Sequence, residues 1–173
     1  PDYVYVHGDT TTTMASSIAA FYSGAQVCHV EAGLRTHNKR SPFPEEINRQ
    51  VAGRICDFHF APTEASKENL LRENINEEGI LVTGNTVIDA LLMVNKKLES
   101  DPILAGEIKK HFEFIDSQRK IVLITGHRRE SFGGGFERIC KAILKLANAY
   151  PEVDFVYPVH LNPNVKKPVY EIL

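Results

Sequence analysis

The sequence lacks an excess of charge and any long apolar run, and each absence excludes a class of function. Its 173 residues contain 20 Lys and Arg against 22 Asp and Glu, a formal net charge of -2. Proteins that bind nucleic acid or anionic membranes by electrostatics usually carry a basic surplus. No segment approaches the roughly 20 apolar residues that span a bilayer, and the first residues do not resemble a signal peptide. We therefore expect a cytosolic protein with no nucleic-acid or membrane partner.

Cysteine is scarce, and its three positions are far apart: Cys28, Cys56 and Cys140. No two of them have the spacing of zinc ligands, so we expect no metal site from them. Free cysteines usually pack as small apolar side chains, and we expect all three thiols to be buried. Histidines are equally scattered, and we interpret His59, in an apolar strand pattern, and His111, near a helix end, as structural.

Both ends of the sequence are abrupt. The chain begins at Pro1 without a methionine, and residues 3–7 already have the aromatic and β-branched content of a strand. At the other end, a helix starting near Pro168 would stop before a C-cap appears. We expect an internal piece of a longer protein, truncated at both ends.

Strand and helix patterns alternate through the first 98 residues. The spacing predicts strands at 3–7, 26–30, 57–61 and 80–83, and helices at 10–22, 45–55, 63–73 and 86–98. Four successive strand–helix units with short turns predict an α/β fold with a doubly wound, Rossmann-like parallel sheet. Ligands of such sheets gather at the carboxyl ends of the strands. The long polar loop at 31–44 is the exception to the short turns, and loops of this length often carry function.

The pattern changes after residue 98. A charged, weakly periodic stretch contains one short helix near 104–111, and a second α/β unit then begins with a strand at 120–125, a helix at 136–149 and a strand at 153–158. We predict three parts: residues 1–98 are the later part of an N-terminal α/β domain, residues 99–118 are a linker, and residues 119–173 begin a C-terminal α/β domain.

Three acidic residues occupy places where a ligand site would form. Asp9 follows the first strand, Glu31 follows the second, and Glu45 begins the helix after the long loop. The simpler alternatives are a helix cap at Asp9, a solvated loop residue at Glu31, and a surface ion pair of Glu45 with Arg49 one turn later. If the carboxylates converge, they repel one another and at least one should hold a proton near neutral pH. That arrangement suits a reaction that removes and returns protons.

Two loops of the second unit carry polar side chains after strands. The loop at 125–135 contains His127, Arg128 and Arg129 before a glycine run and a helix, a pattern typical of phosphate binding. It lacks the Lys-Ser pair of a P-loop, which disfavours an ATPase, and its simpler alternative is an exposed basic loop. The loop at 159–165 offers His160 and Asn162 for hydrogen bonding, with a structural turn as the alternative.

Six segments together resemble the UDP-N-acetylglucosamine 2-epimerases of the non-hydrolysing bacterial type. In family order they are HGDTTTT at 7–13, HVEAGLR at 29–35, PEEINR at 44–49, GNTVID at 84–89, TGHRRE at 125–130 and HLNPNV at 160–165. The resemblance implies two doubly wound α/β domains of the glycosyltransferase-B type and a homodimer. An N-terminal Gly-Thr-Arg-Pro-Glu type motif and a later Asp-Ser-Gly-Gly type nucleotide loop are absent, so we expect this chain alone to be inactive.

The implied reaction interconverts UDP-N-acetylglucosamine and UDP-N-acetylmannosamine for cell-surface polysaccharides, with no metal or nicotinamide cofactor. UDP leaves from C1 as a base removes the C2 proton, and UDP then adds back to 2-acetamidoglucal. The resemblance implies that Asp9, Glu31 and Glu45 take part in this proton traffic. It also implies that His127, which we group with the catalytic residues, contacts the nucleotide. Arg49 is a candidate for orienting a carboxylate or phosphate.

The resemblance further implies a regulatory role for UDP-N-acetylglucosamine, which can bind bacterial members a second time as an activator. Arg128 and His160 match that regulatory pocket, and Arg129 and Asn162 complete the predicted substrate-binding set. Three alternatives remain open: a hydrolysing epimerase that releases free N-acetylmannosamine, a retaining glycosyltransferase of the same fold, and a non-catalytic nucleotide-sugar binding module.

Overall fold

The computed structural model describes residues 1–116, 118–126 and 134–173, and the chain divides into two compact units, Pro1–Lys97 and Leu98–Leu173. Among the described residues, no helix has the length and apolar character needed to cross a membrane. The helix α4 (Thr86–Ser100) contains the boundary between the units, and each unit is considered by itself.

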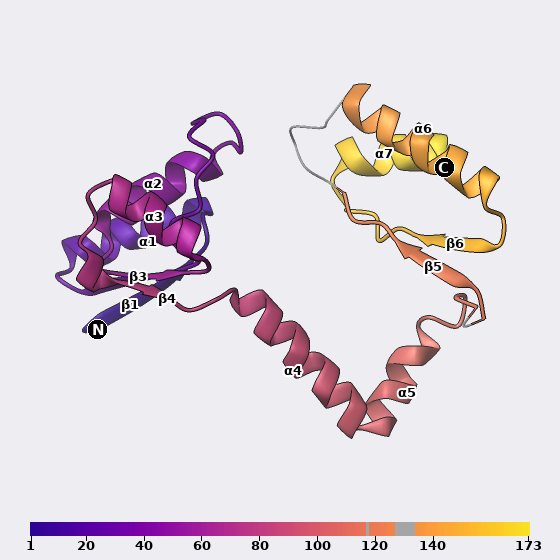
Figure 1. Cartoon of the computed structure of the whole chain (residues 1–173), viewed down its shortest axis with the longest axis horizontal. Coiled ribbons are helices and arrows are strands. Elements are labelled where there is room, and N and C mark those ends of the chain that lie inside the picture. The colour runs from indigo at the N-terminus through magenta and orange to yellow at the C-terminus, as the bar shows by residue number, and fades with distance from the viewer. Residues whose placement is uncertain (117, 127–133) are drawn as a thin grey trace. The chain divides into compact units, whose positions relative to one another are not determined.

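The first unit is a parallel four-stranded sheet with the strand order β1-β2-β3-β4 (Figure 1). Its strands are β1 (Tyr3–His7), β2 (Gln26–Val30), β3 (Phe58–Ala61) and β4 (Ile80–Val82). The helices between them are α1 (Thr11–Tyr22), α2 (Glu45–Ile55) and α3 (Glu64–Arg72), and a 3-10 turn, η1 (Glu77–Gly79), precedes β4. These elements agree with the predicted ones to within two residues at each end. Because neighbouring strands run parallel, the residues that follow β1, β2, β3 and β4 all lie at one edge of the sheet.

Local side chains set the starts of these helices. Thr10 caps α1 by accepting a hydrogen bond from the Thr13 amide (3.2 Å), and Thr63 caps α3 by accepting one from the Ser66 amide (3.1 Å). Helix α2 has no side-chain cap. The negative charges of Glu45 and Glu46 in its first turn stabilise it by interacting with the positive end of the helix dipole. The Thr10 cap confirms the prediction that hydroxyl residues start α1.

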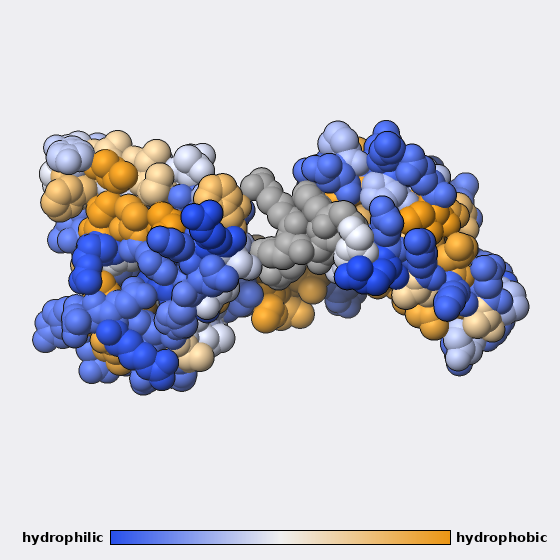
Figure 2. Space-filling model, turned by 90° about the horizontal axis from the view of Figure 1, so that it is seen from above, coloured by the Kyte–Doolittle hydropathy of each residue, from blue (hydrophilic) through white to orange (hydrophobic). Residues whose placement is uncertain are grey.

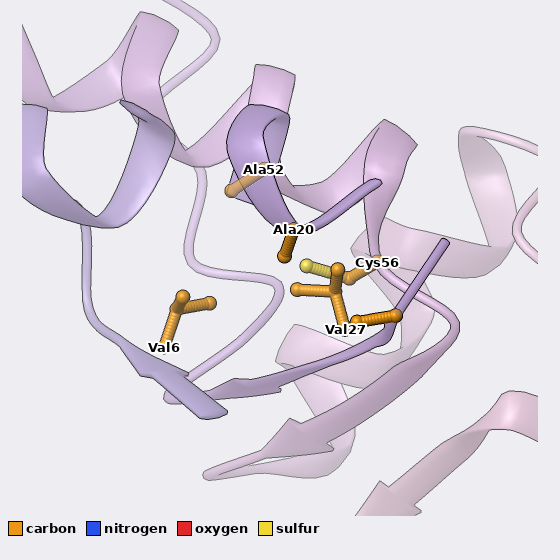
Figure 3. Packing of buried hydrophobic residues seen from close by; sticks show 6 residues of the cluster. Val6, Ala20, Val27, Ala52 and Cys56 are labelled. Carbon is orange, nitrogen blue, oxygen red and sulfur yellow. The ribbon is translucent and has the colours of Figure 1, made fainter. Parts of the chain in front are cut away.

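The core of the first unit lies between the sheet and its helices. One cluster joins Val6 and Val27 of the sheet to Ala20 of α1, Ala52 of α2 and Cys56 (Figure 3). The alanines bring the helices close to the strands, because a longer side chain at either position would fill the same space. A second cluster centres on Leu70 of α3, which is fully buried; burial of such a side chain contributes about 1.5–3 kcal/mol.

The opposite face of this sheet carries aromatic side chains. Tyr5 stacks on Phe60, with ring centroids 6.3 Å apart, and Tyr3 lies at the same distance from Phe58. Tyr3 and Tyr5 are more than half exposed. Seen from above, this unit presents a large hydrophilic area next to a hydrophobic patch (Figure 2).

The second unit contains a parallel pair of strands, β5 (Lys120–Leu123) and β6 (Val153–Val156). Its helices are α5 (Pro102–Lys110), α6 (Gly134–Ala149) and α7 (Pro163–Ile172). Helices α6 and α7 pack through Phe136, Cys140, Val165 and Val169, all nearly or fully buried. With Cys140 buried here and Cys28 and Cys56 buried in the first unit, the prediction of three buried thiols is confirmed.

The prediction of a helix starting near Pro168 was wrong. Helix α7 begins at Pro163 and Pro168 lies inside it. The start is fixed by Asn162, whose Oδ1 accepts a hydrogen bond from the Asn164 amide (2.9 Å), with proline in the first turn where its missing N–H has no intrahelical partner. The packing of Val165 and Val169 against α6 compensates for the backbone hydrogen bond that Pro168 cannot make.

Candidate active site

The turn after β1 is held in place by hydrogen bonds from three directions. Thr13 Oγ1 donates to the His7 carbonyl (2.6 Å), which joins the first turn of α1 to the end of β1. The Gly8 amide donates to the Val30 carbonyl (3.0 Å), and the Gly8 carbonyl accepts from His29 Nε2 (2.8 Å). Gly8 has a φ of +70°, which glycine adopts without strain. Asp9 is therefore presented from a fixed backbone at the carboxyl edge of the sheet.

His29 is fully buried and supports this turn as a neutral side chain. A carbonyl oxygen only accepts hydrogen bonds, so the contact with Gly8 requires the proton on Nε2. Burial is the main cause that lowers the pKa of His29, and the Gly8 contact opposes it only in part. His29 thus fixes the Asp9 turn without adding charge to it.

Asp9 is contacted by two residues of α2. Asn48 Nδ2 donates to the Asp9 carbonyl (2.9 Å), and Arg49 Nε lies 3.7 Å from Asp9 Oδ2. Asn48 and Arg49 are buried, whereas the Asp9 side chain is 30% exposed. These two contacts from α2 hold Asp9 in place, and its carboxylate stays partly exposed and accessible to a ligand.

Glu31 occupies the equivalent place at the end of β2. Its backbone has a φ of 68°, uncommon for a residue with a side chain and unfavourable by about 1–3 kcal/mol. Its Oε2 lies 3.4 Å from His7 Nε2 and the same distance from the position that a Cβ on Gly8 would occupy. The carboxylate of Glu31 therefore lies against the end of β1 and the turn that carries Asp9.

A small depression connects Glu31 to the start of α4. It lies at the carboxyl ends of β2, β3 and β4 and has no room for a water molecule, and Gly84, Asn85 and Thr86 form one wall. Asn85 Oδ1 accepts a hydrogen bond from the Val87 amide (3.0 Å) at the start of α4. The GNT segment, identified in the sequence as a motif without an assigned role, therefore lies beside Glu31.

The first turn of α2 places Glu45 at the end of the long loop. Its Oε2 is buried and has no hydrogen-bond partner among the described residues. Sequence spacing suggested an ion pair of Arg49 with Glu45, but the pair that Arg49 forms on α2 is with Glu46, at 3.1 Å. Glu46 was not among the predicted site residues, although its spacing of three residues from Arg49 was a usable signal.

The beginning of the loop at 31–44 is anchored to α3 and to the residue that follows it. Arg35, whose side chain is fully buried, makes two hydrogen bonds to the carboxylate of Glu73 at the end of α3, at 2.6 and 2.7 Å. Asn69 Nδ2 donates to the Gly33 carbonyl (3.0 Å). A Cβ on Gly33 would lie 2.2 Å from the Ser66 carbonyl oxygen, so only glycine fits there. These anchors give the polar loop a defined stem next to Glu31.

In the second unit, the ends of β5 and β6 are tied together by one side chain. Tyr157 Oη donates to the Gly126 carbonyl (2.5 Å). His160 Nδ1 accepts a hydrogen bond from the Asn162 amide (3.1 Å), so these two predicted residues lie together at the start of α7. The predicted residues His127, Arg128 and Arg129 lie outside the described residues. Among the residues that are described, no cluster of three His, Cys, Asp or Glu side chains could hold a metal ion.

Known proteins match this arrangement over the whole chain. The family model described as UDP-N-acetylglucosamine 2-epimerase matches residues 1–173. The curated epimerases of that name from Yersinia pestis and Escherichia coli K12 are 57% and 56% identical over 173 residues. The chain spans 46% of the length of each of these relatives, about half.

Solved structures agree. The epimerase from Neisseria meningitidis, crystallised with UDP-GlcNAc, superposes with a TM-score of 0.95 at 52% identity, over 100% of this chain and 46% of that one. The enzyme from Methanocaldococcus jannaschii, in complex with UDP-GlcNAc and UDP, gives 0.77 at 35% identity, over 99% of this chain and 45% of that one. The parallel α/β units, the converging strand ends and a family match over every residue lead to one conclusion: this chain belongs to the UDP-N-acetylglucosamine 2-epimerase family.

Proposed function

We propose that the complete protein interconverts UDP-N-acetylglucosamine and UDP-N-acetylmannosamine by eliminating and re-adding UDP. A base removes the proton from C2 while the C1–O bond to UDP breaks, giving 2-acetamidoglucal and UDP. UDP then adds to C1 as a proton is delivered to the other face of C2. The proposal is carried by one observation: Asp9 and Glu31 follow adjacent parallel strands at a shared edge of the sheet, and α2, which begins at Glu45, contacts Asp9 through Asn48 and Arg49.

Proton transfer on two faces of one carbon requires at least two acid–base groups. Asp9, Glu31 and Glu45 are the candidates, because each has a partly exposed carboxylate or an oxygen without a hydrogen-bond partner. Arg49 adds a buried guanidinium next to Asp9, suited to orienting a carboxylate or a phosphate oxygen.

The nucleotide is assigned to the second unit. We propose that His127 and Arg129 contact the UDP, together with Asn162 at the start of α7. The start of the basic loop is fixed by the Tyr157 contact with Gly126, and a phosphate is a fitting ligand for basic side chains that precede a helix. The Neisseria structure contains UDP-GlcNAc and the Methanocaldococcus structure contains UDP-GlcNAc and UDP, which supports a UDP-sugar as the ligand class.

Regulation and assembly follow from the family resemblance. We propose that a second UDP-N-acetylglucosamine activates the enzyme by contacting Arg128 and His160, and that the complete protein is a homodimer that supplies cell-surface polysaccharide synthesis. We also propose that the 173-residue chain alone does not turn over, because its relatives use about twice this length.

The test is proton NMR of the complete protein with UDP-N-acetylglucosamine in deuterated water. We expect the anomeric signal of UDP-N-acetylmannosamine to appear and deuterium to enter at C2, because the proton removed exchanges with solvent before re-addition. Free N-acetylmannosamine with UDP would instead indicate a hydrolysing enzyme. A folded protein that gives neither a new anomeric signal nor C2 exchange would refute catalysis and leave a nucleotide-sugar binding module.

A further inference from the structure

Two consecutive glutamates at the start of α2 have opposite surroundings. Glu45 has a buried oxygen without a hydrogen-bond partner among the described residues. The side chain of Glu46 is fully buried, and both of its carboxylate oxygens accept hydrogen bonds. Two residues of identical chemistry are therefore suited to different tasks, one to meet a ligand and the other to hold its neighbours.

Glu46 joins the long loop to α2. Its Oε1 accepts hydrogen bonds from the His37 amide (3.1 Å) and from Gln50 Nε2 (2.8 Å), and its Oε2 accepts one from the Thr36 amide (3.1 Å). Burial alone would raise the pKa of Glu46, but these donors and Arg49 outweigh it and hold the pKa below its ordinary value. Glu46 is thus a buried carboxylate that stays charged and fixes the turn at residues 36–37.

The same carboxylate competes with Asp9 for Arg49. Arg49 Nε lies 3.1 Å from Glu46 Oε2 and 3.7 Å from Asp9 Oδ2, and its N–H does not complete a hydrogen bond of regular geometry with either. A guanidinium fully paired with Asp9 would occupy the oxygens that a substrate proton must reach. In the structure the Nε of Arg49 lies closer to Glu46 than to Asp9.

We propose that Glu46 is a positioning residue of this site: it holds Arg49 short of full pairing with Asp9 and ties the 36–37 turn to α2. Glu46 acts through Arg49 and the loop, and the reacting atoms are contacted by other residues. The consequence for catalysis rests on the proposed function, whereas the consequence for the position of Arg49 does not.

The test is Glu46→Gln in the complete protein, a change that preserves shape and removes the charge. We expect the crystal structure to show Arg49 Nε shifted to a charge-assisted hydrogen bond with Asp9, about 2.8 Å long. The amides of Thr36 and His37 should exchange with solvent about 10-fold faster, since a glutamine offers one acceptor oxygen where two were used. We expect kcat to fall by about 100-fold, because small misplacements near reacting groups have effects of that size, while KM changes little.

Glu45→Gln is the matched control for the contacts. It makes the same chemical change one residue earlier, and it should leave the exchange of the Thr36 and His37 amides and the Arg49–Glu46 distance as they are. Glu46→Asp keeps the charge but withdraws it by one methylene, so it should recover part of the lost kcat. If Glu46→Gln does not fold, Glu46→Asp takes its place, with a smaller loss of kcat and faster exchange of both amides.

The outcomes separate this inference from the proposed function. An unmoved Arg49 with unchanged kcat in the Gln variant would overturn the inference while leaving the epimerase intact. A loss of activity explained entirely by a smaller folded fraction would overturn it as well. If the unsubstituted protein shows no epimerisation, the proposed function fails, and the position of Arg49 and the amide exchange still decide whether Glu46 holds these groups.

Discussion

The first unit buries charged and polar side chains, whereas the second unit buries only apolar ones among its described residues. In the first, the buried polar side chains lie between Thr13 and Ser66 and include His29, Glu46 and Arg49. In the second, the buried residues are those that join α6 to α7. Buried polar groups stabilise a fold only when their partners are in place. The stability of the first unit should therefore depend on protonation and pairing, and that of the second on packing.

The largest expected effect tests packing in the second unit. Phe136→Ala removes a side chain that is only 1% exposed from the contact between α6 and α7, and we expect the free energy of unfolding of this unit to fall by about 4 kcal/mol. Leu161→Ala, at a position 84% exposed, is the control and should change it by less than about 0.5 kcal/mol. Denaturant titrations with one probe in each unit measure both. If Phe136→Ala lowered the free energy of unfolding of both units equally, the effect would not be a property of packing in the second unit.

The next effect, acid sensitivity, should belong to the first unit. Burial, reinforced by the neighbouring His29, lowers the pKa of His59 to about 4. Well above pH 6.5 the ring is neutral in both states, and His59 does not make stability depend on pH. As the pH falls from 6.5 toward 4, only the unfolded chain binds a proton, so the free energy of unfolding falls, by up to about 3 kcal/mol at about 1.4 kcal/mol per pKa unit. Burial lowers the pKa of His29 as well, which adds in the same direction.

Unfolding measured by denaturant at pH 7, 6 and 5 checks this acid sensitivity. His59→Phe, which keeps an aromatic side chain but cannot take up a proton, should weaken the pH dependence of the first unit. A first unit with the same stability at pH 7 and pH 5 would show that its buried histidines do not set its acid response.

The smallest effect sharpens the role of pairing within the first unit. Glu73→Ala leaves the fully buried guanidinium of Arg35 without its carboxylate, and we expect a loss of about 2–3 kcal/mol, below that of a fully buried pair because Glu73 is 31% exposed. Glu77→Ala removes the partner of Lys67 from a pair in which the Glu77 side chain is 67% exposed, and should reduce stability much less, because solvent screens the pair. Thermal unfolding of the two variants side by side measures the difference. Similar losses would show that burial does not decide the strength of these pairs.

Much of the fold could be predicted from the sequence because its signals are local. The aromatic and β-branched content of Tyr3–His7, the hydroxyl residues near Thr10 and the strand pattern at Gln26–Val30 each depend on residues close in the chain. The structure confirms the elements that they predicted. Pro168 was misread because its tolerance inside α7 depends on packing against α6, which no local pattern records. The positions of Asp9 and Glu31 followed from parallel pairing alone, since strand ends in such a sheet share one edge.

By itself the sequence determined the order of strands and helices, the carboxylates at the strand ends and the family, because these depend on nearest neighbours and on motif identity. Only the tertiary structure decided that Glu46 accepts hydrogen bonds at both carboxylate oxygens, whereas Glu45 Oε2 has no hydrogen-bond partner among the described residues. Glu46 meets the amides of Thr36 and His37 because the loop folds back over α2, and Arg49 reaches Asp9 because α2 lies beside the β1 turn. Such contacts join residues distant in the chain, and their strength comes from exclusion of water, which only a packed interior provides.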